Sequence, residues 1–186
     1  RLDVDWHAQV ATGVTAMKLP VFLCPAEPQD QIRLRNGAPY VAPITYGFNS
    51  GTWHVFSPSQ RKSGDGVFIV NGSLRSADVS DGLSNTLAVA EVKAYQPYLR
   101  NTSDPVSPTA YAPERFRSLS GQFLTTGHTV WPDGRVHHAG FTATFTPNTS
   151  IPFEFEGKWY DVDYSSQQEG NSATRATVAA VTSRSY

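Results

Sequence analysis

The sequence predicts a single α+β domain that is predominantly antiparallel β, with a short N-terminal helix and long loops. Thirteen prolines, fourteen glycines and a 12% share of aromatic residues are typical of a β-rich chain with many turns. Apolar and polar residues alternate at 140–146 and again at 151–156, which indicates strands with two unlike faces. A helical spacing of apolar residues occurs near the N-terminus, at 6–17.

The elements of the first part of the chain follow from local patterns. The helix over 6–17 rests on four apolar residues at spacings of four, four and three: Trp6, Val10, Val14 and Met17. A short edge strand bounded by prolines is expected at 19–25, and loop at 26–43. Aromatic and β-branched residues mixed with glycines predict a strand with a bend at 45–53.

The remainder is predicted to alternate between loops and strands. Polar residues at 57–65 indicate a surface loop, and four prolines with many Ser and Thr residues at 96–114 indicate an extended surface excursion. Strands are predicted at 66–70, 87–92, 140–146, 151–164 and 173–181. The first of these reads as a buried strand that ends at the turn Asn71-Gly72.

Length and charge limit the classes of protein. The chain is long enough for one domain, residues 1–186, that buries about 70% of its unfolded surface. The net charge is −1 and no basic run exceeds the pair Arg61-Lys62, so nucleic acid is excluded as a partner. Cys24 is the only cysteine, so the chain cannot close an internal disulfide. No apolar run reaches the roughly 18 residues of a membrane-spanning helix.

The most specific segment is 79–87 (VSDGLSNTL). Asp81-Gly82 is a turn dipeptide whose glycine takes positive φ without strain. The side chains of Ser84, Asn85 and Thr86 can hydrogen-bond nearby backbone groups. The segment is therefore predicted to form a fixed turn that directs the strand at 87–92.

Two groups of residues are candidate metal ligands. His128, Asp133 and His137 supply imidazole and carboxylate groups, which suit a transition metal. Their spacing is not that of a helical zinc motif, and a turn at Asp133-Gly134 beside structural histidines explains them better. No cofactor is expected from these residues. A second group of residues, described next, makes calcium the one metal that stays possible.

That second group is Asp78, Asp81 and Asn85, followed by Glu91, whose oxygen atoms lie around a turn as calcium requires. The alternating acidic positions of a calcium loop are missing. The favoured interpretation therefore makes Asp81 a turn residue, Asn85 a cap and Glu91 a solvated or locally paired strand residue.

The chain carries no motif for enzymatic activity, and none is expected. A nucleophile elbow, a phosphate-binding glycine loop and a dinucleotide fingerprint are all absent, and Cys24 beside Pro25 is interpreted as packed. Paired carboxylates for glycoside hydrolysis, with an aromatic sugar platform, could come from Glu154, Glu156, Asp161, Asp163, Trp159 and Tyr160. Acidic residues on the exposed face of an antiparallel strand explain this pattern better.

Several segments, in this order, resemble a large family of bacterial pilin-like proteins of unassigned function, which have a prepilin-type N-terminal cleavage and methylation segment. They are 22–28 (FLCPAEP), 44–47 (ITYG), 66–68 (GVF), 80–86 (SDGLSNT) and Glu91. A subgroup is also similar at 127–137 (GHTVWPDGRVH), 140–142 (GFT), 147–149 (PNT) and 182–186 (TSRSY). The motif residues carried over are Cys24, Pro25, Asp81, Gly82, Ser84, Asn85, Thr86 and Glu91.

The resemblance implies a pilin-like head domain. Family members begin with a hydrophobic anchor helix and end with a His-x9-Asp-Gly motif, and both lie outside this sequence. The implied function is that of a non-enzymatic structural subunit of a pilus or pseudopilus-like assembly, related to type II secretion or type IV pili.

Such a protein would lie outside the cell or at its surface, and its membrane contact would come from the anchor helix alone. Its partners would be copies of itself or related subunits, and a disulfide partner of Cys24 would lie outside this sequence. The alternatives are a secreted β-rich carbohydrate-binding or hydrolytic module and a metal-binding protein.

Overall fold

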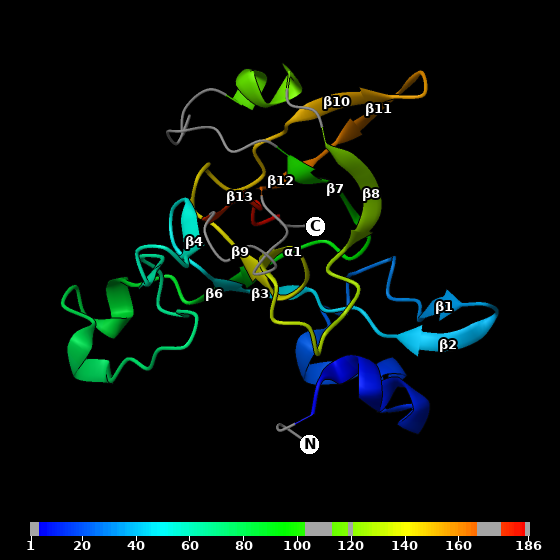
Figure 1. Cartoon of the computed structure of the whole chain (residues 1–186), viewed down its shortest axis with the longest axis horizontal. Coiled ribbons are helices and arrows are strands. Elements are labelled where there is room, and N and C mark those ends of the chain that lie inside the picture. The colour runs from blue at the N-terminus through cyan, green and yellow to red at the C-terminus, as the bar shows by residue number, and fades with distance from the viewer. Residues whose placement is uncertain (1–3, 103–112, 119–120, 167–175, 185–186) are drawn as a thin grey trace.

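The structure is a computed structural model that describes residues 4–102, 113–118, 121–166 and 176–184. Two sheets form its centre (Figure 1). The larger has the order β5-β4-β13-β12-β7-β8, with β4 His54–Ser57, β5 Lys62–Ser63, β7 Gln96–Thr102, β8 Gln122–Gly127, β12 Asp163–Ser166 and β13 Thr177–Ala180. The smaller has the order β6-β3-β9, with β3 Tyr46–Asn49, β6 Val89–Glu91 and β9 Gly140–Phe141.

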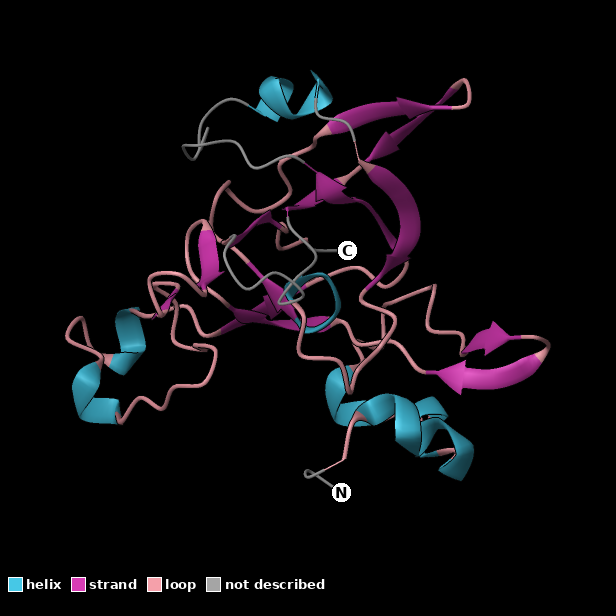
Figure 2. Ribbon diagram, viewed as in Figure 1, coloured by secondary structure: helices cyan, strands magenta, loops and turns pink. Residues whose placement is uncertain are grey.

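Two hairpins and several short helices surround these sheets (Figure 2). The hairpins are β1 Arg33–Arg35 with β2 Ala38–Val41, and β10 Pro152–Phe155 with β11 Lys158–Asp161. The 3-10 helices are η1 Trp6–Thr12, η2 Val14–Ala16, η3 Pro20–Phe22, η4 Ser76–Asp78, η5 Leu83–Asn85 and η6 Pro113–Ser118, and the α-helix is α1 Val136–Ala139. The hairpins and the 3-10 helices lie at the periphery, so the sheets hold the molecule together.

The centre of the larger sheet is its most buried part. All four residues of β13 and all four of β12 are buried. β12 pairs antiparallel with β13 and parallel with β7, so Tyr164 lies opposite both Ala180 and Leu99. The residues of β13 are small or β-branched, and such residues pack closely on both faces of a sheet.

Aromatic rings fill the core against this sheet. Trp53 stacks on Tyr164 with ring centroids 6.0 Å apart, and the ring of Phe116 meets both of them edge-on. Offset stacking and edge contacts are the arrangements that the aromatic quadrupole favours. A second cluster joins the larger sheet to the smaller one and consists of Val92, Val136, Phe141, Ala179 and Val181.

The predicted fold class is wrong. The structure is β-rich with mixed sheets, in which most strand pairs are antiparallel and β12–β7 and β3–β9 are parallel. Its one α-helix among the described residues spans four residues, and the remaining helical segments there are short 3-10 turns. The described residues thus form a β structure with helical turns at its edge, which gives no support to a pilin-like head. Within the same residues, no helix is long and apolar enough to span a membrane.

The predicted N-terminal amphipathic helix is replaced by η1 and η2, which are separated by Gly13 at φ 76°. A 3-10 helix has three residues per turn, so apolar residues spaced by four do not stay on one face. Met17 accordingly is 54% exposed, while the buried residues here are Thr15 and Ala16.

Four other local predictions are corrected. The proline-bounded strand at 19–25 is the 3-10 turn η3, and the segment 66–70, predicted to be a buried strand, is half-buried to exposed and has no strand pairing. The loop at 26–43 contains the β1–β2 hairpin. The excursion at 96–114 begins with the strand β7, whereas residues 103–112 lie outside the described part of the chain.

Several strand predictions are confirmed, with shorter bounds than expected. β3 lies within 45–53, β6 within 87–92, β10 and β11 within 151–164, and β13 within 173–181. The alternating segment 140–146 is strand only at β9. These successes come from segments where β-branched and aromatic residues alternate with polar ones.

Replacing Gly66 by alanine is expected to lower the free energy of unfolding by about 2 kcal/mol. An added Cβ would lie against the carbonyl oxygen of Asn49 and the backbone nitrogen of Gly51, neither of which is free to move aside. Gly134→Ala is the matched control, because a Cβ there meets no atom within 4 Å. Urea unfolding of the three proteins measures the difference, and equal stability of the Gly66 and Gly134 variants would contradict it.

Candidate functional site

Residues 66–88, here called the side lobe, project from the two sheets and carry η4 and η5 (Figures 1 and 2). Large apolar side chains in this lobe are 40–64% exposed: Phe68, Val70, Leu74, Leu83 and Leu87. Several large exposed apolar side chains on one projecting segment make the side lobe a candidate interaction surface.

The turn at the end of the side lobe is built as its sequence predicts. Gly82 has φ 82°, and its amide donates to the carbonyl of Val79. The Asn85 side chain donates to the carbonyl of Asp81 at 2.9 Å, and Thr86 Oγ1 donates to the carbonyl of Gly82 at 3.1 Å. These bonds stay within the turn, so they fix its shape while Ser84, Asp81 and Leu83 remain exposed.

The side lobe is attached to β3. Asn49 donates its side-chain amide to the carbonyl of Leu87 at 2.8 Å and its backbone amide to the carbonyl of Ala88 at 2.9 Å. The rings of Phe48 and Phe68 lie 4.7 Å apart. The lobe is therefore held at both of its ends while its apolar tip faces solvent.

The candidate calcium ligands have local partners in the structure. Asp78 is held by Arg75, with an ion pair of 3.0 Å and a bond from the Arg75 backbone amide of 2.8 Å. These bonds lower the pKa of Asp78 below its usual value. Asn85 uses its amide on the Asp81 carbonyl, and Glu91 lies opposite Tyr46 in the sheet. Each residue thus has a local structural role.

The candidate transition-metal ligands are all buried but are engaged with protein groups. His128 Nδ1 lies 3.2 Å from the carbonyl of His138, and the ring of His137 stacks on Tyr98 with centroids 4.7 Å apart. Both carboxylate oxygens of Asp133 accept bonds from Arg135. Over the described ranges, no group of three His, Cys, Asp or Glu side chains is placed to hold a metal ion.

Burial keeps these histidines neutral. It lowers the pKa of His128, and it lowers the pKa of His137 and His138 well below the usual range. The cation of Arg135 adds to the lowering at His137. Burial alone would raise the pKa of Asp133, but the bonds from Arg135 outweigh it and lower that pKa. The histidine cluster is therefore uncharged beside a fixed ion pair.

A buried ion-pair network ties the end of the described chain to the larger sheet. Arg184 pairs with Asp163 at 2.9 Å and also with Asp161. Asp163 accepts two more bonds from the amide and hydroxyl of Thr182, at 3.1 and 2.9 Å. Burial disfavours the Arg184 charge, but the two carboxylates outweigh it, so the pKa of Arg184 is raised.

Two of the four carboxylates considered for glycoside hydrolysis, those of Asp161 and Asp163, are paired with Arg184 in this network. Asp163 is 2% exposed, so it does not lie on a solvated strand face. Of the two proposed platform residues, Tyr160 packs on Phe123 with ring centroids 4.8 Å apart, and Trp159 is 66% exposed. The hairpin β10–β11 therefore offers one free aromatic ring rather than a pair.

The remaining motif residues have structural positions. Cys24 is an unpaired, half-buried cysteine whose amide donates to Thr45 Oγ1 at 2.6 Å, and Pro25 is exposed. The carbonyl of Glu91 accepts the amide of Arg184 at 2.8 Å. Sequence reasoning missed Glu27, which is buried and accepts the amides of Ala94 and Gln29 at 2.9 and 2.8 Å.

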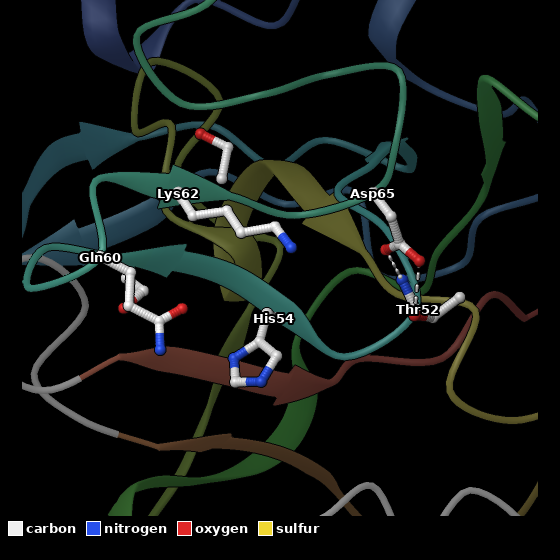
Figure 3. A pocket seen from close by; sticks show the side chains of 7 residues that line it. Thr52, His54, Gln60, Lys62 and Asp65 are labelled. Carbon is white, nitrogen blue, oxygen red and sulfur yellow. Dashed lines mark hydrogen bonds between the residues drawn. The ribbon is translucent and has the colours of Figure 1, made fainter.

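A polar cavity of about 290 Å³ lies beside the β4–β5 hairpin (Figure 3). Its lining consists of polar residues: Thr52, His54, Ser57, Gln60, Lys62, Ser63 and Asp65. Asp65 accepts the amide and hydroxyl of Thr52 at 2.6 and 2.8 Å. Burial alone would raise the pKa of Asp65, but the hydrogen bonds from Thr52 outweigh burial and lower that pKa, so the carboxylate stays ionised.

Comparison with known proteins gives a family but no characterised relative. The model of the family described as "Protein of unknown function (DUF1559)" matches residues 1–182. Searches of curated proteins and of solved structures found no match. Since the match spans nearly the whole chain, this protein belongs to the DUF1559 family of proteins of unknown function.

Proposed function

We propose that this protein is a non-enzymatic structural subunit of a surface pilus or pseudopilus-like assembly, related to type II secretion or type IV pili. Two observations support this function: the DUF1559 match and the family segments that resemble pilin-like proteins. Its partners would be copies of itself or related subunits. An N-terminal hydrophobic helix of the full-length protein would anchor it in the membrane and expose this domain outside the cell.

The exposed apolar side lobe is the observation that carries the proposal. Contacts between subunits need apolar side chains that are accessible before assembly and a backbone that is already ordered, because ordering on contact costs affinity. Leu83 and Leu87 are 64% and 49% exposed, and the bonds from Asn85 and Thr86 hold the turn between them. Assembly through such a lobe does not require a pilin-like fold of this domain.

The native full-length protein tests this function. Gel fractionation should place it in a high-mass filament fraction, and mass spectrometry should find a methylated hydrophobic mature N-terminus. A monomeric secreted protein without such a helix would contradict the proposal.

Replacing Leu83 and Leu87 by serine in the full-length protein is expected to reduce the high-mass fraction about tenfold or more, because both side chains are removed from the contact. The unfolding midpoint should stay the same, since neither side chain is buried. Val21→Ser is the matched control, because Val21 is 76% exposed but lies outside the side lobe. An unchanged high-mass fraction in the double variant would exclude the lobe as the contact surface.

A further inference from the structure

The tip of the β4–β5 hairpin carries the longest basic run of the sequence, Arg61-Lys62. Both side chains are exposed, and neither forms an ion pair or side-chain hydrogen bond within the part of the chain that the structure describes. Other basic side chains of the described residues pair with carboxylates, as Lys18 does with Asp30 and Arg135 with Asp133. The two cations of the hairpin are thus available to a ligand.

Two cavities meet at this hairpin. One is the polar cavity of about 290 Å³, and the other has a volume of about 640 Å³. Lys62 and Ser63 line both of them, while Arg61 lines the larger one. In the view of Figure 3, the long side chain of Lys62 lies between the two strands of the hairpin, with His54 and Gln60 below it. A ligand could therefore occupy both cavities while contacting the same cation.

The lining chemistry differs between the two sides. The smaller cavity offers the amide of Gln60, the imidazole of His54 and the ionised carboxylate of Asp65. The larger cavity adds the apolar side chains of Phe56 and Ile69. A compact multivalent anion would be repelled by Asp65, whereas sugar hydroxyls donate to a carboxylate and sugar C–H groups pack on apolar side chains.

We propose that the β4–β5 hairpin binds an acidic saccharide. Its anionic group would lie against Lys62 and Arg61, its hydroxyl groups would bond to Gln60, His54 and Asp65, and a ring face would rest on Phe56. Lysine and arginine bind carboxylates through charge-assisted hydrogen bonds, which are stronger than neutral ones. Ile69 and Val70 of the side lobe line the larger cavity, whereas Leu83 and Leu87 line neither cavity.

The hairpin is fixed before a ligand arrives. Gly64 donates its amide to the carbonyl of Val55 at 3.0 Å, and Ser63 Oγ donates to the carbonyl of Val70 at 2.8 Å. A Cβ at Gly64 would lie against the carbonyls of His54 and Ser50, so this close approach needs glycine. A preorganised site loses less conformational entropy on binding.

Calorimetric titration of this chain with tetragalacturonate tests the site, and the methyl ester of the same oligosaccharide is the neutral control. We expect saturable binding with a Kd of about 0.01–1 mM, and at least about tenfold weaker binding of the ester. Binding should weaken as salt is added, because the cations are exposed. Absence of saturable tetragalacturonate binding below about 10 mM, or equal affinity for the ester, would overturn the proposal.

Substitutions locate the site. Lys62→Gln and Arg61→Gln should each raise the Kd for tetragalacturonate about fivefold or more, while Lys158→Gln, on the exposed hairpin β11, should leave it unchanged. All three residues are exposed, so the variants should keep the unfolding midpoint of the parent chain. Equal Kd values for Lys62→Gln and Lys158→Gln would place any binding elsewhere. Because the assay uses this chain alone, its failure would leave the filament experiment unaffected.

Discussion

Replacement of Arg184 by alanine is expected to lower the free energy of unfolding by about 3–5 kcal/mol. Arg184 and Asp163 are 4% and 2% exposed, and the pair joins the end of the described chain to the larger sheet. Removing the guanidinium leaves the Asp163 carboxylate buried with only its two bonds from Thr182. An unpaired buried charge is costly because little solvent reaches it.

Arg184→Lys separates charge from geometry. One guanidinium donates to Asp163 and to Asp161 from different nitrogens, and a single ammonium cannot match both positions. We expect the free energy of unfolding of Arg184→Lys, measured with urea, to lie between those of Arg184→Ala and the parent chain. Arg75→Ala is the surface control, because its pair with Asp78 leaves Arg75 85% exposed and solvent screens such a pair, so its removal should change stability little. An equally small loss for Arg184→Ala would show that the pair is not a structural requirement.

The network also shows what sequence could not supply. Asp163 and Arg184 lie 21 residues apart, and the alternation around Asp163 indicated a solvated strand face. Pairing with β7 and β13 on either side buries that strand instead. Which strands become neighbours is a long-range property, so a local pattern that predicts the strand correctly does not determine which of its residues are buried.

Some missed elements did have a local signal. Asn36-Gly37, with φ of 52° and 78°, forms the turn of the β1–β2 hairpin, and this dipeptide is the strongest short-range sign of a hairpin. The apolar run at 66–70, by contrast, gave a local signal for a buried strand that the structure does not contain. A short apolar run predicts burial only when a sheet is available to receive it, and here Phe68 contacts Phe48 while remaining 46% exposed.

Of the candidate sites, too, some could be predicted from local sequence and others could not. The self-contained turn at Asp81-Gly82 could be predicted, because all of its hydrogen bonds join neighbours in sequence. The cavities beside β4 and β5 could not, because they require segments 52–65 and 69–72 to fold against one another. Their only sequence signal was Arg61-Lys62, which is too short a run to indicate a nucleic-acid surface.

Stability is expected to fall between pH 7.5 and pH 5.5 through the buried histidines, by at most about 1.4 kcal/mol for each ring that stays neutral in the folded chain. Burial lowers the pKa of His128, His137 and His138 in the folded chain, whereas a histidine in the unfolded chain titrates near its ordinary pKa of 6.5. Below that pH the unfolded state binds more protons than the folded state, so acid favours unfolding. Above it all three rings are neutral in both states, and the effect vanishes.

Burial determines the sign of the effect, and the charged groups around the cluster modify its size. Arg135 and Arg100 disfavour a charge on His137, and Asp133 and Asp163 favour charges nearby without overcoming burial. Urea unfolding at the two pH values should show the loss, and His137→Gln should reduce it by up to about 1.4 kcal/mol, the most that one histidine can contribute over this interval. His54→Gln, at an exposed position, should leave it intact. Equal stability of the parent chain at pH 7.5 and 5.5 would mean that these rings are protonated within the fold, which their burial opposes.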